Sequence, residues 1–323
     1  MPEVRFTVII RCAGGTQGLA RLLRALDDLD YPAEQFEVLI ADSSDRQEPD
    51  GAYPQLPQTG YALRYMSLRD ASLPEAMNAA VRESQGEFLA FLDEDSIPTP
   101  EWLSAYDMAF DSWLAGIVGG SSGPPRDGDV YQKCVGLVHS SLARTLGLVT
   151  GQQLVGRYYP RLSNMAARKE AVLLAGGFDE QAVECPEIRM VLRMQHIGYR
   201  TFYCPSAAVR HYQEDDLFGF IGTDFRIAME RARYCHQSGV NVLPVGVVAL
   251  ILLMFGLAYD AHTLAVHAVR ITVGGYALAL ALSGLHAAVS VGSLAVAFFL
   301  PIFLAMHHAV YLIGLAFGRF TRV

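Results

Sequence analysis

The sequence predicts an α/β protein in which a doubly wound, mostly parallel sheet is followed by a C-terminal α-helical transmembrane region. The sheet is indicated by short apolar runs, rich in β-branched residues, that alternate with segments of helical periodicity over the first hundred residues. The membrane region is indicated by charge, because Asp260 and Arg270 are the only formally charged residues between Val240 and Gly318.

Composition narrows the class of protein. The chain has 323 residues and a net charge of −8, so we expect no nucleic-acid partner. Its five cysteines are odd in number and show no CxxC or Cys/His zinc spacing, as expected for reduced thiols in the cytosol. The N-terminal residues contain no apolar stretch of secretory length, so we expect no signal peptide and a cytosolic N-terminal domain.

Apolar spacing and turn residues set the expected elements. The leucines between positions 19 and 26 fall on one helical face, and Pro32 ends that helix. The run from Phe88 to Leu92 is unbroken and apolar, which is typical of a strand covered on both faces of a parallel sheet. We therefore expect strands over residues 6–10, 36–41, 63–67 and 88–92, and helices over residues 17–29 and 74–84.

Acidic side chains follow two of these strands. Asp93 and Asp95 come directly after residues 88–92, and Asp42 follows residues 36–41. Because side chains at i and i+2 of a strand point the same way, Asp93 and Asp95 can reach one point at the carboxyl end of the sheet, where open α/β sheets bind ligands. Two carboxylates there suit Mg²⁺ or Mn²⁺. The alternative is a charged loop that caps a core strand.

Two common nucleotide-binding motifs are missing. The first strand is followed by Gly14 and Gly15 but not by GxGxxG, and GxxxxGK[ST] occurs nowhere in the chain. The sequence therefore disfavours dinucleotide binding of the Rossmann type and P-loop chemistry.

Several weak motifs nevertheless follow one another in order along residues 6–240. They are Asp42, Ala76-Met77-Asn78, FLAFLDEDSIPTPEWL, NMAAR at 164–168, AGGFDE at 175–180, Arg193, Gly198-Tyr199-Arg200, Tyr203-Cys204-Pro205 and Val209-Arg210-His211. In this order and spacing they resemble the family 2 glycosyltransferases, which are inverting enzymes with a GT-A fold. The strength of the resemblance lies in the series, because no single motif suffices.

The resemblance implies a nucleotide-diphosphate sugar as the donor and Mg²⁺ or Mn²⁺ as the cofactor. It implies that Asp93, Asp95 and His211 hold the metal. It also places Ala13 and Asp42 at the base and ribose, while Asn78 either contacts the nucleotide or braces a loop. The nucleotide-sugar-binding residues implied in this way are Ala13, Asp42, Asn78, Asp93, Glu94 and Asp95.

The sequence departs from the family pattern at the catalytic base. Family members usually carry a Glu-Asp pair shortly before a leucine-rich stretch and an Arg. Counting back from Arg193, the position of that Asp falls on Glu187, which follows Pro186 instead of an acid. Glu184 is the alternative if Cys185 and Pro186 shift the local register. An inactive site that only binds the nucleotide sugar is a further alternative.

The C-terminal third is predicted to meet the membrane. Residues 217–235 form a helix with one apolar face, which either lies in the headgroup plane or packs as a core helix. Three spans are expected over about residues 242–259, 271–289 and 291–315. The expected domains are a transferase domain at 1–215, an interface helix or linker at 216–239 and a transmembrane region at 240–323.

The sequence leaves open how many times this region crosses the membrane and on which side the C-terminus lies. Arg319 and Arg322 favour a cytosolic C-terminus and hence an even number of spans, whereas three spans put the tail outside. His307, His308, Tyr311 and Gly314 resemble the terminal segment of exopolysaccharide-type family 2 transferases with C-terminal membrane helices.

These patterns together predict a multi-pass protein of the plasma (inner) membrane with a cytoplasmic catalytic domain. The expected activity is metal-dependent, inverting transfer of a sugar from a nucleotide-diphosphate donor to a lipid-linked acceptor, in the synthesis of cell-surface polysaccharide or glycolipid. Membrane lipids are expected partners. The alternatives are a catalytically silent nucleotide-sugar-binding subunit and a processive polysaccharide synthase.

Overall fold

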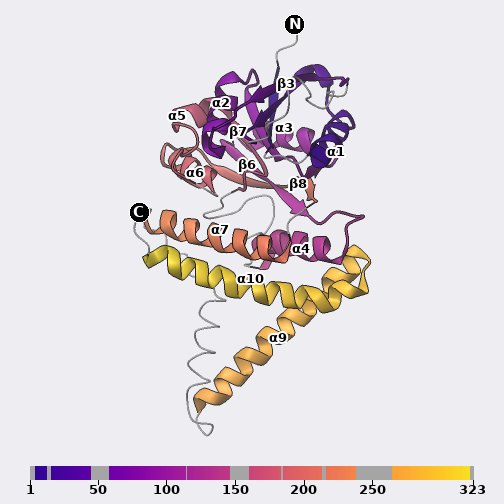
Figure 1. The fold of residues 1–323 in the computed structure, drawn as a ribbon, viewed down its shortest axis with the longest axis vertical. Coiled ribbons are helices and arrows are strands. Elements are labelled where there is room, and N and C mark those ends of the chain that lie inside the picture. The colour runs from indigo at the N-terminus through magenta and orange to yellow at the C-terminus, as the bar shows by residue number, and fades with distance from the viewer. Residues whose placement is uncertain are drawn as a thin grey trace. The chain divides into compact units, whose positions relative to one another are not determined.

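The computed structural model describes residues 4–12, 16–44, 58–113, 115–145, 160–182, 185–212, 216–237 and 264–320. The chain divides into two compact units (Figure 1). Unit 1 contains residues 1–123 and 148–212, and unit 2 contains residues 124–147 and 213–323. Unit 2 therefore takes a segment from the middle of the chain, which the sequence pattern does not predict.

Unit 1 is built on one eight-stranded sheet with the order β3-β2-β1-β4-β7-β6-β8-β5. The first four strands in this order are parallel to one another, and β7 is antiparallel to both β4 and β6. The strands are β1 (Phe6–Cys12), β2 (Phe36–Asp42), β3 (Ala62–Ser67), β4 (Phe88–Asp93), β5 (Ser96–Pro98), β6 (Ile117–Gly123), β7 (Asn164–Arg168) and β8 (Thr201–His211). The predicted strands are confirmed, and the antiparallel strand β7 makes the sheet mixed.

Helices cover both faces of this sheet because successive strand residues point to opposite sides. Phe6, Val8 and Ile10 of β1 pack in a core with α1 and α3, whereas Ile9 packs in a second core with α2, α5 and α6. The helices are α1 (Thr16–Asp27), α2 (Leu73–Glu83), α3 (Trp102–Trp113), α5 (Lys169–Leu174) and α6 (Pro186–His196), with a 3₁₀ turn, η1, at Ala33–Gln35. The doubly wound α/β prediction is confirmed.

The NMAAR motif has a structural role in this sheet. Asn164, at the start of β7, is buried, and its side-chain oxygen accepts hydrogen bonds from Trp102 Nε1 at 2.9 Å and Tyr106 Oη at 2.7 Å. Its side-chain nitrogen donates to the carbonyl oxygens of Ser121 and Ala207. The side chain therefore satisfies polar groups of α3, β6 and β8 in a site without water access, where leaving them unpaired would be costly.

Unit 2 is helical. It contains α4 (Val130–Thr145), α7 (Leu217–Gln237), α9 (Leu264–Val291) and α10 (Leu294–Phe320). Helices α7 and α10 lie side by side, as Figure 1 shows. Gly314 and Gly318 allow this approach, because a Cβ at Gly318 would lie 2.2 Å from the carbonyl oxygen of Met229 and one at Gly314 would lie 2.6 Å from that of Phe225. Small residues four apart are a common means of close helix packing in membranes.

Among the described residues, two helices are long and apolar enough to cross a membrane, over residues Arg270–Val291 and Leu294–Arg319. Only 11% and 28% of their most apolar windows are buried within the protein. Large apolar side chains such as Ile271, Val289 and Phe298 are exposed, which suggests membrane association. These helices correspond to the second and third predicted spans, and the first, residues 242–259, lies outside the described residues.

A buried acidic group joins three helices of unit 2. Asp224 of α7 is 1% exposed. Its Oδ2 accepts a hydrogen bond from His307 Nδ1 of α10 at 2.6 Å, and its Oδ1 lies 3.4 Å from His139 Nε2 of α4. Burial favours the neutral acid, but the interactions with His139 and His307 outweigh it and hold the pKa of Asp224 well below its usual value.

We expect Asp224→Asn to lower the thermal midpoint of the detergent-solubilised protein by about 5 °C at pH 7. The depressed pKa means that the charged carboxylate contributes stability above the unfolded-state pKa of about 3.9, and that this contribution is lost as the pH falls through the folded-state value. The difference between the thermal midpoints of the two proteins should therefore begin to shrink below about pH 4 and should become smaller at each lower pH. A constant difference at all pH values would show that the ionised form of Asp224 adds nothing.

Candidate active site

The candidate site lies where β1 and β4 end. These strands are parallel, and their register places Arg11 of β1 beside Asp93 of β4. Arg11 Nη2 donates to Asp93 Oδ2 at 2.7 Å. The other oxygen, Asp93 Oδ1, is buried and has no hydrogen-bond partner among the described residues. The strand end therefore presents an ion pair with one buried carboxylate oxygen still unsatisfied.

Asp95 and His211 are brought together by a short strand pairing. After the turn at Glu94 and Asp95, β5 pairs antiparallel with the end of β8, and Ser96 lies opposite His211. His211 Nδ1 lies 3.1 Å from Ser96 Oγ and 3.5 Å from Asp95 Oδ1. The backbone N–H of Tyr212 also donates to the carbonyl oxygen of Asp95 at 3.0 Å. Two candidate metal ligands that are 116 positions apart in the chain thus meet at one sheet edge.

The charge state of Asp95 is set by its neighbours. Burial raises the pKa of this carboxyl, but its hydrogen bond with His211 and the charges of His211 and Arg11 lower it more, so the pKa lies below its ordinary value. Asp95 is therefore ionised at neutral pH. Its side chain keeps 32% of its surface exposed, which leaves it accessible to an incoming cation.

Glu187 comes into this neighbourhood from another element. It lies in the first turn of α6, after Pro186, and is 4% exposed. Its charge is one of those that raise the pKa of Arg11, after Asp93 and Asp95. The charge of Glu187 thus acts on the same cation that contacts Asp93. The alternative base, Glu184, lies outside the described residues.

Asp42 is the last residue of the neighbouring strand, β2, and its carboxylate accepts hydrogen bonds from nearby residues. Its Oδ2 accepts a hydrogen bond from Tyr65 Oη at 2.9 Å, and its Oδ1 accepts one from the backbone N–H of Ser44 at 2.8 Å. Leu39 and Ala41 of β2 face α2, whereas Ile40 faces α1. Because strand side chains alternate, Asp42 lies on the same side as Ile40, which is the α1 side of the sheet. The structure therefore places Asp42 at the same end of the sheet as Asp93 but on the other face. Ala13 lies outside the described residues.

Asn78 braces a loop. Its side-chain oxygen accepts from the Phe178 N–H at 2.7 Å, and its amide group donates to the Phe178 carbonyl and to Glu180 Oε1, each at 3.1 Å. Gly177, with φ +71°, lies against it, and a Cβ there would be 2.4 Å from Asn78 Oδ1. Of the two roles predicted for Asn78, the bonds support bracing of the AGGFDE segment.

Glu94 turns away from Asp93 and Asp95. Its Oε2 accepts from the Cys12 thiol at 2.8 Å, and its backbone packs closely on Gly18 of α1, where a Cβ would lie 2.7 Å from the Glu94 carbonyl oxygen. The structure thus separates this carboxylate from the Asp93 and Asp95 pair. Its proposed contact with the nucleotide sugar would have to be made on the α1 side.

The donor set fits a divalent cation only in part. Asp95 and His211 offer an oxygen and a nitrogen at one point, and both suit Mn²⁺. Within the described residues, no group of three or more His, Cys, Asp and Glu side chains converges on one point. The remaining positions around a cation would be filled by substrate phosphate oxygens and water, which is the usual arrangement for such ions.

Arg11 is the site residue that sequence reasoning missed. The sequence contains one indication of its role. Arg11 directly follows the apolar run at residues 6–10, and a charged residue at the end of a buried strand is unusual unless it is paired. The partner could not be named from sequence, since it depends on which strand lies next to β1 and in what register.

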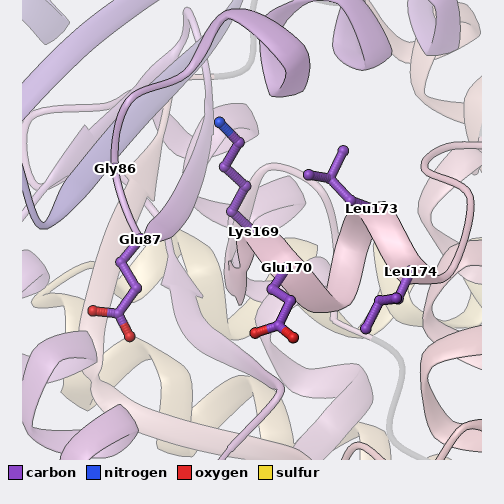
Figure 2. Close-up of a pocket in the computed structure, with 6 residues that line it drawn as sticks. All are labelled: Gly86, Glu87, Lys169, Glu170, Leu173 and Leu174. Carbon is purple, nitrogen blue, oxygen red and sulfur yellow. The ribbon is translucent and has the colours of Figure 1, made fainter.

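The pocket drawn in Figure 2 lies elsewhere. It is lined by Gly86, Glu87, Lys169, Glu170, Leu173 and Leu174. Gly86 and Glu87 precede β4, whereas Asp93 ends it, so this pocket lies at the opposite end of that strand from the candidate site. It contains none of the predicted site residues.

The chain is similar to known glycosyltransferases in sequence and fold. Residues 7–144 match the model of "Glycosyl transferase family 2". The chain is 21% identical over 197 residues to glycosyltransferase AglE of Haloferax volcanii, covering 60% of this chain and 62% of that protein. It is 31% identical over 91 residues to the succinoglycan biosynthesis protein ExoM of Rhizobium meliloti, covering 27% and 28%. The chain thus spans less than two thirds of either relative.

A solved structure has a similar fold. It is the mannosyltransferase PcManGT from Pyrobaculum calidifontis, in complex with GDP-Man and Mn²⁺. It is 20% identical, with a TM-score of 0.57, and the match covers 98% of this chain and 86% of that one. At this identity the likeness concerns the fold.

The mixed sheet, the helices on both of its faces and the acids at its carboxyl edge define a GT-A fold. The matched region, residues 7–144, carries β1, β2 and β4 and includes Arg11, Asp42, Asp93 and Asp95. Residues 7–144 of this chain therefore resemble glycosyl transferase family 2, within a fold similar to that of a solved mannosyltransferase.

Proposed function

We propose that the protein is a membrane-anchored, metal-dependent, inverting glycosyltransferase that uses a nucleotide-diphosphate sugar. The observation that supports this most strongly is the meeting of Asp95 and His211 at the carboxyl edge of the sheet. The charge of Glu187 also acts on the same Arg11 that pairs with Asp93. The match to family 2 and the resemblance of the fold to a mannosyltransferase in complex with GDP-Man and Mn²⁺ are consistent with this chemistry.

Each group has one proposed task. A bound Mg²⁺ or Mn²⁺ neutralises the charge that develops on the leaving diphosphate. Asp95 and His211 hold the cation, with Asp93 beside them, and Asp42 binds the nucleoside. Glu187 accepts the proton from the acceptor hydroxyl as that oxygen attacks the anomeric carbon. The attack displaces the diphosphate from the opposite side of the sugar, so the anomeric configuration inverts.

The proposed acceptor is linked to a lipid, and the proposed location is the plasma (inner) membrane with unit 1 in the cytosol. Two long apolar helices with largely exposed surfaces support membrane anchoring. A transferase whose acceptor is held in the bilayer gains from such an anchor, because both then share one surface. ExoM is named as a protein of succinoglycan biosynthesis, which fits a role in making cell-surface polysaccharide.

We expect the purified full-length protein, with Mn²⁺, to transfer label from one member of a panel of GDP- and UDP-linked sugars to a hydroxyl of a sugar linked to polyprenyl diphosphate in vesicles. EDTA should abolish this transfer, and Mn²⁺ should restore it. The reason is that the leaving diphosphate needs a cation to neutralise it. The measurement is radiolabel in the lipid extract, with anomeric configuration read by NMR.

Other outcomes select the alternatives. Donor binding without transfer or hydrolysis of any panel member would support the catalytically silent subunit. Long products that grow with time would support a processive synthase. Transfer that resists EDTA would contradict the metal-dependent mechanism.

A further inference from the structure

Arg11 is a cation built into the candidate site. It follows the apolar run of β1, and strand alternation turns it to the same face as Ile9, which is the face covered by α6. Its side chain is 35% exposed and that of its partner Asp93 is 15% exposed. The guanidinium therefore sits at the sheet edge where the donor's diphosphate is proposed to bind.

One carboxylate contacts this cation, and the charges of two more act on it. The charge of Asp93 is the largest influence raising the pKa of Arg11, and the charges of Asp95 and Glu187 raise it further, although burial opposes them. A guanidinium stays protonated at all physiological pH values. Arg11 thus offsets part of the negative charge at the end of β4, where it pairs with Asp93 at 2.7 Å.

A second cation entering this cluster meets that fixed positive charge. Asp93 is already paired at 2.7 Å, so a divalent ion alone would find one of its carboxylates committed and would be repelled by the guanidinium. A nucleoside diphosphate changes this balance, because its phosphates add negative charge that both Arg11 and the ion can share.

Resting on the proposed function, we propose that Arg11 is a positioning residue that makes divalent-cation binding depend on the nucleotide. Arg11 weakens the affinity of the empty site for the cation and supports the cation–diphosphate complex. Because binding couplings are reciprocal, the cation then raises nucleotide affinity by the same factor. The protein would therefore hold its metal chiefly when the donor is bound.

The test is Mn²⁺ binding to the full-length protein, measured by electron paramagnetic resonance of free Mn²⁺, alone and with saturating GDP or UDP. In the wild type we expect the nucleotide to tighten Mn²⁺ binding about tenfold or more. Arg11→Gln should bind Mn²⁺ alone about tenfold more tightly than the wild type and show a smaller effect of the nucleotide. Arg11→Lys, which keeps the charge, is the matched control and should stay close to the wild type.

Unchanged or weaker binding of Mn²⁺ alone by Arg11→Gln would overturn the inference. Equal Mn²⁺ affinity of the wild type with and without nucleotide would also overturn the inference. This second measurement uses the wild type alone and does not depend on the folding of a variant. Asp95→Asn distinguishes a failure of the proposed function: if it binds Mn²⁺ and nucleotide like the wild type, the metal site itself is misassigned.

Discussion

Asp95→Asn should lower the rate of sugar transfer by about a thousandfold or more, because it removes the charged oxygen proposed to hold the cation at the leaving diphosphate. His211, whose Nδ1 lies 3.5 Å from the Asp95 carboxylate, cannot replace the lost charge. In the variant it faces a neutral amide. The measurement is initial rate of label transfer at saturating donor, alongside Mn²⁺ affinity with the nucleotide bound. Both quantities should fall together.

The control for this variant is Asp111→Asn, an exposed aspartate on α3 that contacts Arg5 at 2.6 Å. It makes the same chemical change away from the site and should keep at least about half of the wild-type rate, because exposed ion pairs contribute little. If Asp95→Asn transferred sugar at a rate like that of Asp111→Asn, the acids after β4 would be a strand cap, which is the alternative that the sequence leaves open.

Glu187→Gln should lower transfer by about a hundredfold to ten-thousandfold while donor and Mn²⁺ binding stay within about threefold of the wild type. The amide keeps the size of the side chain and cannot accept the proton of the acceptor hydroxyl. The expected result is thus a loss of kcat with little change in donor KM. Rates would be measured at several donor and acceptor concentrations, with donor affinity measured separately by calorimetry.

Glu170→Gln is the matched control, because Glu170 also lies in the first turn of a helix, α5, but is exposed and outside the site. It should leave kcat unchanged within about twofold, since an isolated surface charge has little influence on a distant reaction. If Glu187→Gln behaved in the same way, the base would have to be another group, and Glu184 would be the next residue to replace.

The fold was largely predictable because its signals are local. The apolar runs at 6–10, 36–41, 63–67 and 88–92 each match an observed strand, and the leucine face after residue 16 matches α1. The antiparallel strand β7 was not predicted as such, since pairing direction follows from how the chain returns to the sheet. The insertion of α4 into unit 2 was missed for the same reason, because it depends on which helix covers its apolar face.

The candidate site was predictable in its residue types more than in its contacts. Asp93 and Asp95 stand out because acids directly follow a buried strand, and strand periodicity turns both the same way. The neighbourhood of His211 follows from the pairing of β5 with β8, which joins residues more than a hundred positions apart. The sequence alone offered His211 only through a family resemblance.

The sequence by itself determined an α/β domain with acids at the carboxyl ends of its strands and a C-terminal region of apolar helices, because side-chain periodicity and the absence of charge are properties of short stretches. Only the tertiary structure decided that Arg11 pairs with Asp93, that the charge of Glu187 acts on the same cation, and that Asp224 joins α4, α7 and α10. These contacts join segments whose register is fixed by packing, and electrostatic interactions over a few ångströms depend on that register.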